Sequence, residues 1–148
     1  MREIILSKLN LKTFTEQDAL DYCLLNSLNP DNIIILYLSF NNLTDISEIK
    51  LFKNLEILFL HNNKIKDISI IQYLNKLELL DIGYNNIFNI SVLKDLTNLQ
   101  NLNIQNLELE SDQIEYINNL KNLKTLFCQN AFKDRNSLNE LNKNIKLV

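Results

Sequence analysis

The amino-acid sequence predicts one α/β domain that forms a right-handed solenoid, with a parallel β-sheet on its concave side and short 3₁₀ or helical turns on its convex side. Three observations predict this fold class. Apolar residues recur in one order every 22 residues, each copy contains a short segment that alternates as a strand does, and the 148 residues include only one glycine and one proline. An asparagine that recurs in phase replaces glycine as the turn signal.

Three segments superpose at this spacing without a gap, and each has six apolar positions and one asparagine. They are Ile33, Leu36, Leu38, Asn41, Leu43, Ile46 and Ile49; Leu55, Leu58, Leu60, Asn63, Ile65, Ile68 and Ile71; and Leu77, Leu80, Ile82, Asn85, Ile87, Ile90 and Leu93. A fourth copy with two extra residues has Leu99, Leu102, Ile104, Leu107, Leu109 and Ile117, and a weaker fifth has Leu123, Leu126, Cys128 and Ala131. Near the N-terminus we find a further set of apolar residues, which we interpret as a divergent copy: Leu6, Leu9, Leu11 and Phe14.

This pattern resembles the repeat of the leucine-rich-repeat family, LxxLxLxxNxLxx, over nearly the whole chain. The 22-residue period and the sequence Asp-Ile-Ser at 45–47 and 67–69, with Asn-Ile-Ser at 89–91, are similar to the internalin-like and phosphatase-regulator-like subclass. The resemblance implies a module that binds another protein through the concave surface of its sheet.

Each copy should place one short strand in the sheet. Along such a strand Leu36 and Leu38 point into the core, whereas Ile35, Tyr37 and Ser39 point outward. Consecutive copies are expected to stack as neighbouring parallel strands, because no single copy can bury its own apolar residues. The apolar positions after the asparagine then fill the convex side through short turns.

The phased asparagine lies where the chain leaves each strand. A buried amide needs hydrogen-bond partners, and the backbone groups of the adjacent turns are available to it. We therefore expect a structural ladder of Asn41, Asn63 and Asn85. Leu107 and Ala131 occupy the same position in the last two copies and cannot form these bonds, so the ladder should end after the third copy.

The single domain, residues 1–148, divides into an N-terminal cap with the divergent repeat (1–32), the repeats (33–130) and a C-terminal cap (131–148). Residues 15–28 predict a helix in the N-terminal cap, with Thr15 as N-cap and Asp18 near its positive end. Its apolar face is expected to contain Leu20, Leu24, Leu25 and Leu28. At the other end, Asp134 or Asn136 begins a helix, and the last edge is closed by Ile145, Leu147 and Val148.

The sequence carries no pattern typical of an enzyme. His61 is the only histidine, so neither a metal site nor a catalytic triad is expected. Cys23 and Cys128 should lie about five strands apart, too far for a disulfide, and we expect free thiols. We therefore expect no catalytic residue, no metal, no cofactor and no small-molecule substrate.

Charge and hydropathy narrow the choice of partners. The net charge of −3 argues against nucleic acid, and no run of apolar residues is long enough to span a membrane. The first eleven residues lack the apolar stretch of a secretory signal, which favours a cytoplasmic protein.

Outward strand positions are not needed for folding, so their occupants indicate function. Copies one to three bring apolar and aromatic residues together there, with polar residues beside them, as in a protein interface. The predicted partner-binding residues are Ile35, Tyr37, Phe40, Ile57, Phe59, His61, Leu79, Asp81 and Tyr84. The same alignment would place Lys8 and Asn10 of the divergent copy in these outward columns.

Two functions are consistent with this surface. The first is a non-enzymatic adaptor or a regulatory or inhibitory subunit that binds a protein partner. The alternative is a structural or assembly component that associates with itself through the same face, although a monomer is favoured over a homodimer. A flanking segment that covers the patch is a third, purely structural reading.

Overall fold

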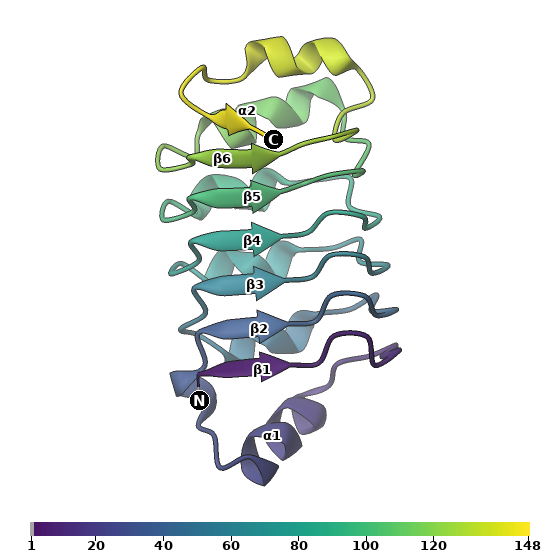
Figure 1. Ribbon diagram of the computed structural model, residues 1–148, viewed down its shortest axis with the longest axis vertical. Helices are drawn as coiled ribbons and strands as arrows, with labels where there is room; N and C mark the ends of the chain where they lie inside the picture. The colour runs from purple at the N-terminus through teal and green to yellow at the C-terminus, as the bar shows by residue number, and fades with distance from the viewer. Residues whose placement is uncertain (1) are drawn as a thin grey trace.

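Seven short strands lie side by side in one parallel sheet, in the order in which they follow along the chain (Figure 1). The computed structural model describes residues 2–148, and the strands are β1 (Glu3–Ile5), β2 (Ile35–Tyr37), β3 (Ile57–Phe59), β4 (Leu79–Asp81), β5 (Asn101–Asn103), β6 (Thr125–Phe127) and β7 (Lys146–Leu147). From β2 to β5 the register is constant, because the consecutive partners are Ile35, Ile57, Leu79 and Asn101. The predicted solenoid is confirmed.

Helical segments connect the strands (Figure 1). They are α1 (Glu16–Leu25), η1 (Pro30–Asn32), η2 (Ser47–Leu51), η3 (Ser69–Tyr73), η4 (Ser91–Asp95), η5 (Ser111–Gln113), α2 (Ile114–Asn118) and η6 (Arg135–Glu140), where η marks a 3₁₀ turn. Those between β2 and β6 lie behind the sheet, whereas α1 lies at the N-terminal end of the stack and the segment after β6 at the C-terminal end (Figure 1).

The 3₁₀ turns η2, η3 and η4 each begin with a serine. The side-chain oxygen of the residue two positions earlier accepts a hydrogen bond from the N–H of that serine at 2.8 Å, which fixes the start of the turn. These residues are Asp45, Asp67 and Asn89. The two extra residues of the fourth copy lie where η5 and α2 replace a single 3₁₀ turn.

All seven phased positions of each regular copy are buried. A further phased apolar position, which the repeat pattern above did not include, is also buried and consists of Phe52, Leu74, Leu96 and Leu120. It follows each convex turn, and Phe52 stacks on Phe14 of the first coil with 6.4 Å between the ring centroids. Burial of each such side chain stabilises the fold by roughly 1.5–3 kcal/mol before conformational entropy is subtracted.

Side chains of the phased asparagines connect consecutive coils. Asn63 Nδ2 donates to the Leu60 carbonyl of its own coil at 2.9 Å and to the Leu38 carbonyl of the preceding coil at 3.0 Å. Its Oδ1 accepts a hydrogen bond from the Leu43 N–H at 3.0 Å. Asn85 forms the equivalent bonds one coil later. Each buried amide is thus satisfied by two coils, and it can form these bonds only if the coils stay in register.

The asparagine ladder ends after Asn85. Leu107 takes the next position and is buried, but a leucine offers no hydrogen bond to the preceding coil. Between the fourth and fifth coils the backbone replaces the side chain, since the Leu109 N–H donates directly to the Ala131 carbonyl at 2.7 Å. The coils therefore stay together beyond the ladder through main-chain hydrogen bonds.

The alignment predicted for the first coil is wrong. In β1, Glu3 pairs with Ile35 and Ile5 pairs with Tyr37, an offset of 32 residues, so Ile4 takes the core position that we assigned to Leu9. Leu9 is instead 56% exposed, because it falls at the ladder position of a coil that has no preceding neighbour. The spacing of the early leucines matches the repeat by coincidence.

The same offset moves two residues out of the strand columns. Lys8 and Asn10, predicted at outward strand positions, lie in the loop after β1 and have φ values of 62° and 57°. Asn41 reaches this loop, and its Oδ1 accepts hydrogen bonds from the N–H groups of Leu9 and Leu11 at 3.1 Å each. The ladder thus extends back to the first coil.

Helix α1 begins as predicted, with Thr15 and Asp18 in a reciprocal capping box. Its predicted apolar face is wrong, because Leu24 and Leu25 are 78% and 85% exposed while Ala19 and Cys23 are buried. The helix is the convex element of the first coil and packs toward η2, so only the side that faces the next coil is covered. Its assignment as a cap stays a prediction.

At the C-terminal end, the Asp134 side chain accepts a hydrogen bond from the Asn136 N–H at 2.9 Å and begins η6. The element is a 3₁₀ turn instead of the expected α-helix. Leu141 and Ile145 are buried, and β7 adds a final strand to β6. The two chain ends therefore lie at opposite ends of the stack (Figure 1).

We expect Asn63→Ala to destabilise the fold by about 1–3 kcal/mol, because it leaves the buried Leu43 N–H without a partner and removes one of the two amide donors of the Leu38 and Leu60 carbonyls. Urea unfolding followed by circular dichroism measures the change. The exposed residue Gln72 serves as a control, since Gln72→Ala should shift the unfolding free energy by less than about 0.5 kcal/mol. Equal stability of the two variants would contradict the role of the ladder.

Candidate functional site

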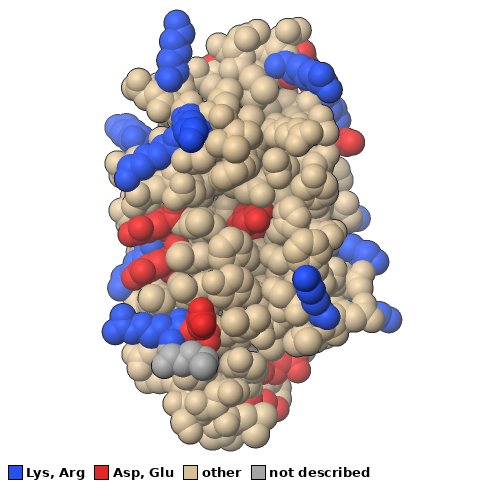
Figure 2. All heavy atoms as spheres, viewed as in Figure 1, with Lys and Arg blue, Asp and Glu red and all other residues tan. Residues whose placement is uncertain are grey.

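The exposed side of the sheet faces the viewer in Figure 2, and its middle is mostly uncharged, with lysine and arginine side chains toward the margins. We define the sheet face by three rows of outward residues on β2 to β6 and just after them. These rows are Ile35, Ile57, Leu79, Asn101 and Thr125; Tyr37, Phe59, Asp81, Asn103 and Phe127; and Ser39, His61, Gly83 and Gln105. Asp81 is the only acidic or basic residue in them besides His61.

Aromatic rings pack against one another across the first three regular coils. Tyr37 and Phe59 stack with 4.9 Å between centroids and 10° between ring planes. His61 lies between Phe40 and Tyr84, at centroid distances of 5.2 and 4.8 Å. The rings form a continuous half-exposed apolar surface, which is the arrangement found at the centre of protein interfaces.

Phe40 and Tyr84 are held in a backbone conformation that aromatic residues rarely adopt. Their φ values are 59° and 54°, in the left-handed region, and the equivalent residues of the other coils are Asn62 and Asn106. Asparagine tolerates this region, whereas another L-residue loses about 1–2 kcal/mol there. Two large side chains, 46% and 44% exposed, thus stand where folding alone favours asparagine. Such strain is typical of a functional surface.

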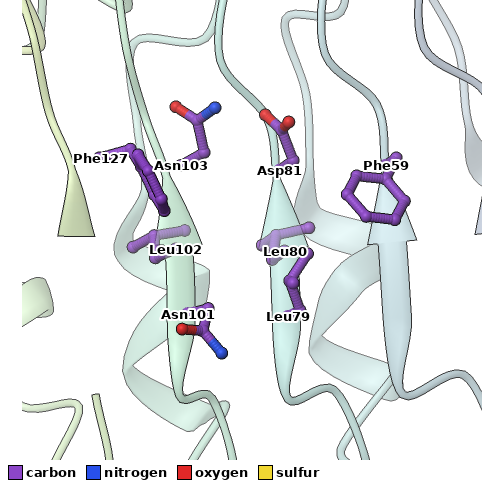
Figure 3. A pocket seen from close by; sticks show the side chains of 8 residues that line it. All are labelled: Phe59, Leu79, Leu80, Asp81, Asn101, Leu102, Asn103 and Phe127. Atoms are coloured by element: carbon purple, nitrogen blue, oxygen red, sulfur yellow. The ribbon is translucent and has the colours of Figure 1, made fainter. Parts of the chain in front are cut away.

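A pocket of about 250 Å³ opens on the sheet face between Phe59 of β3 and Phe127 of β6 (Figure 3). It exists because the two residues between these rings in the same row, Asp81 and Asn103, have shorter side chains. The pocket is also lined by Leu79, Leu80, Asn101 and Leu102. Two aromatic walls therefore enclose a space that contains a carboxylate and amide groups.

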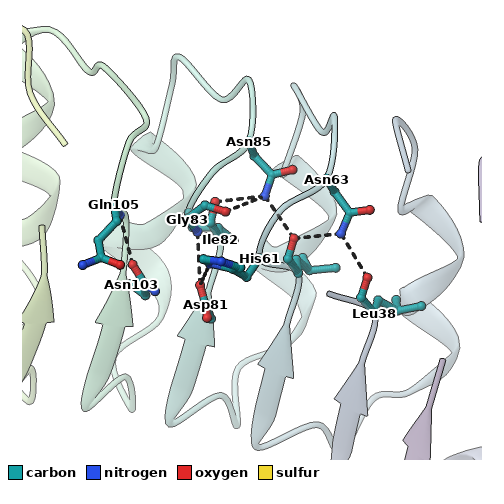
Figure 4. Close-up of polar contacts among 10 residues, drawn as sticks. Leu38, His61, Asn63, Asp81, Ile82, Gly83, Asn85, Asn103 and Gln105 are labelled. Atoms are coloured by element: carbon teal, nitrogen blue, oxygen red, sulfur yellow. Dashed lines mark hydrogen bonds and ion pairs between the residues drawn. The ribbon is translucent and has the colours of Figure 1, made fainter. Parts of the chain in front are cut away.

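Asp81 stands between this pocket and a second hollow of about 410 Å³ that His61 and Tyr37 line. Its Oδ1 accepts a hydrogen bond from the Gly83 N–H at 3.2 Å and lies 3.5 Å from His61 Nδ1 (Figure 4). Burial raises the pKa of Asp81 above its usual value, while His61, the Gly83 N–H and the Asn103 side chain act in the opposite direction.

Gly83, the only glycine of the chain, leaves room for Asn103. A Cβ at position 83 would lie 3.0 Å from Asn103 Oδ1 and 3.3 Å from the Gln105 carbonyl oxygen. Asn103 Oδ1 also accepts a hydrogen bond from the Gln105 N–H at 3.0 Å (Figure 4). A side chain at 83 would have to displace these neighbours by a few tenths of an ångström, so glycine relieves crowding here.

The structure brings the nine predicted partner-binding residues together on the sheet face, or in the loops that directly follow its strands. Whether they bind a partner stays a prediction. Sequence reasoning did not select Asn101, Asn103 and Phe127, which complete the pocket with the fourth and fifth copies. Their rows were visible in the repeat alignment, but only residues of the first three regular copies were selected from it.

Among residues 2–148, no three His, Cys, Asp or Glu side chains are grouped so that they could hold a metal ion. In the same range no helix is long and apolar enough to cross a bilayer. Cys23 and Cys128 are buried free thiols, as expected, and burial raises the pKa of both, which disfavours the reactive thiolate.

A family model described as Leucine Rich repeats (2 copies) matches residues 31–73. No curated protein matches the chain by sequence. Among solved structures, the chain is similar to the internalin InlF of Listeria monocytogenes, with 32% identity and a TM-score of 0.71 over 79% of this chain and 34% of that one. The chain thus spans about a third of the InlF structure.

Two further structures share the fold. Internalin C2 of Listeria monocytogenes is 25% identical with a TM-score of 0.61, over 99% of this chain and 70% of that one. The leucine-rich-repeat ectodomain of the receptor kinase SOBIR1 from Arabidopsis thaliana is 23% identical with a TM-score of 0.65, over 88% and 68%. The second likeness shows the fold alone.

Replacing Tyr84 in two ways tests the backbone strain. Tyr84→Ala and Tyr84→Asn both remove the ring, but asparagine tolerates a positive φ, so we expect the Asn variant to be more stable by about 1 kcal/mol. Urea unfolding of both proteins measures the difference. At Tyr73, inside η3, the order should reverse because alanine is the better helix former. Identical unfolding of the two Tyr84 variants would show that φ at this position imposes no strain.

Replacing Asp81 tests its electrostatic cost. Since burial raises its folded-state pKa, the ionised carboxylate destabilises the fold fully above that pKa, and the destabilisation disappears as the pH falls to the unfolded-state pKa. Asp81→Asn keeps an acceptor for the Gly83 N–H and removes the charge. We expect a higher melting temperature than wild type at pH 7 and a smaller difference in acid. A difference that grows as the pH falls would refute this assignment.

Proposed function

The chain is a leucine-rich-repeat protein, and from this premise we propose that it is a non-enzymatic protein-binding module that acts as an adaptor or as a regulatory or inhibitory subunit. The leucine-rich-repeat fold is commonly a protein-interaction module. The proposal assigns the contact to the sheet face, with Tyr37 and Phe59 at its centre and the Phe40, His61 and Tyr84 rings beside them.

One observation carries this proposal. The coils are held together by the buried apolar positions and the asparagine ladder, neither of which uses the aromatic side chains of the sheet face. Tyr37, Phe59, Phe40 and Tyr84 nevertheless form an apolar surface, two of them against the preference of their backbone. A surface that folding does not need, with aromatics at its centre and amides around it, favours a protein contact.

The side chains of the sheet face also favour binding over catalysis. A hydrolytic triad needs a nucleophile bonded to its base. Within residues 2–148 the His61 ring lies near Asp81, but its Nδ1 has no hydrogen-bond partner, so the nearby Ser39 hydroxyl is not bonded to it. The pair is better suited to recognising a charged or polar group than to activating an attacking group.

Self-association through the same face is the competing use, and the oligomeric state separates the two. A binding module should remain a monomer over a wide concentration range, because its apolar surface is reserved for a different protein. A dimer that is lost in Phe59→Asp would favour an assembly role. The cytoplasmic location expected from the sequence stays a prediction.

Affinity capture from the source cells tests the proposed face. We expect the variant with Tyr37→Ala, Phe59→Ala and Tyr84→Asn to lose at least about tenfold of the partner recovered by wild type, because it removes the central rings. Asn at position 84 avoids the backbone strain that Ala would retain. Mass spectrometry of the retained proteins measures the loss.

The matched control changes two exposed aromatic residues that lie off the sheet face, Tyr73 and Phe88, to alanine. This variant should retain the partner. Tyr73 lines a separate hollow of about 880 Å³ with Pro30, Leu51 and Ile70, so a partner lost only in the control would place binding there and refute the sheet face. Light scattering establishes in parallel whether each variant is monomeric.

A further inference from the structure

We propose that the pocket between Phe59 and Phe127 receives a lysine or arginine side chain of the protein partner, with Asp81 as its counter-ion. This inference rests on the proposed function of the sheet face, and it specifies the type of partner residue, a basic one, that the face recognises. The pocket lies at the end of the aromatic surface, where the rings of the first regular coils give way to polar side chains.

The shape of the pocket suits one long side chain. Its volume of about 250 Å³ lies between the rings of Phe59 and Phe127, beside the outward side chain of Leu79 and over the strands at the buried residues Leu80 and Leu102 (Figure 3). The methylene stem of lysine or arginine can pack on these apolar groups while its charged end reaches the Asp81 carboxylate. The Phe59 ring, one strand away from Asp81, can also attract the cation through its electron-rich face.

Charge complementarity selects a cation over other occupants. Asp81 is the only acidic residue in the rows of the sheet face, and no lysine or arginine within residues 2–148 forms an ion pair with it. An acidic side chain would be repelled. An apolar side chain would remove the carboxylate from water without supplying a hydrogen bond, which costs more than it gains.

The surroundings of Asp81 leave the pocket side available to a partner. Gly83 and His61 contact its Oδ1 from the side that faces away from the pocket, and His61 lines the other hollow. In the free protein the partly buried carboxylate is costly to ionise, since burial raises its pKa. A bound cation would offset that cost and return the pKa toward its usual value.

Asn101 and Asn103 add neutral hydrogen-bonding groups beside the carboxylate. Asn103 Oδ1 is engaged by the Gln105 N–H, so its position is fixed before binding. Such a preorganised mixture of one carboxylate and amides suits a multiply donating ammonium or guanidinium group.

Selection from a library of short random peptides displayed on phage tests the proposal on purified wild-type protein, Asp81→Asn and Asp81→Lys. Wild type should enrich lysine or arginine at one fixed position of the recovered peptides. A synthetic peptide from that pool should bind Asp81→Asn about ten- to a hundredfold more weakly, as expected when a charge-assisted hydrogen bond is lost. Asp81→Lys should select aspartate or glutamate at the same position. Circular dichroism verifies that both variants fold.

Three results would overturn the pocket assignment: no peptides recovered by wild type, peptides with no fixed basic position, or peptides whose affinity is unchanged by Asp81→Asn. The aromatic variant at Tyr37, Phe59 and Tyr84 separates this failure from failure of the proposed function. Peptides that lose binding on the aromatic variant but ignore Asp81→Asn refute only the pocket. Peptides that bind the aromatic variant as well as wild type refute the sheet face itself.

Discussion

A buried asparagine amide has to find hydrogen-bond partners, and in this protein it finds them in two coils at once. Asn63 bonds to the Leu60 carbonyl of its own coil and to the Leu38 carbonyl and Leu43 N–H of the preceding one. A shift of one residue between the coils would break both bonds to the preceding coil and leave the buried Leu43 N–H unpaired, which costs about 1–3 kcal/mol. The ladder therefore keeps the strands in constant register, and the register brings together every side chain of the exposed face.

The exposed face follows from this register. Strand partners lie about 4.8 Å apart, so the residues of one row contact each other directly. Two long rings in succession, Tyr37 and Phe59, stack, whereas the shorter Asp81 and Asn103 leave a pocket before Phe127. The lengths of successive side chains along one row therefore decide where the sheet face is raised and where it has a pocket.

Several residues of this face lower the stability of the fold. Phe40 and Tyr84 occupy a left-handed position that Asn62 and Asn106 fill more easily, and Asp81 is a partly buried carboxylate that forms no ion pair with a lysine or arginine of residues 2–148. Each would be more stable as asparagine, judged by the physics of the fold alone. These costs are tolerable because the repeated apolar core is uninterrupted from Ile4 to Ile145. A repeat scaffold can therefore carry unfavourable residues where a partner is expected to contact them.

The sequence by itself determined the regular coils, because a 22-residue period and a phased asparagine admit one register. It also determined the outward residues, since alternation along a strand leaves no choice of face. Tertiary structure alone decided the ends and the pocket. The first coil is 32 residues long, and the spacing of Leu6, Leu9 and Leu11 hid Ile4 as its core residue. The contact with the neighbouring η2 decides which side of α1 is buried. The pocket depends on the lengths of side chains on four strands. A local sequence pattern contains neither kind of information.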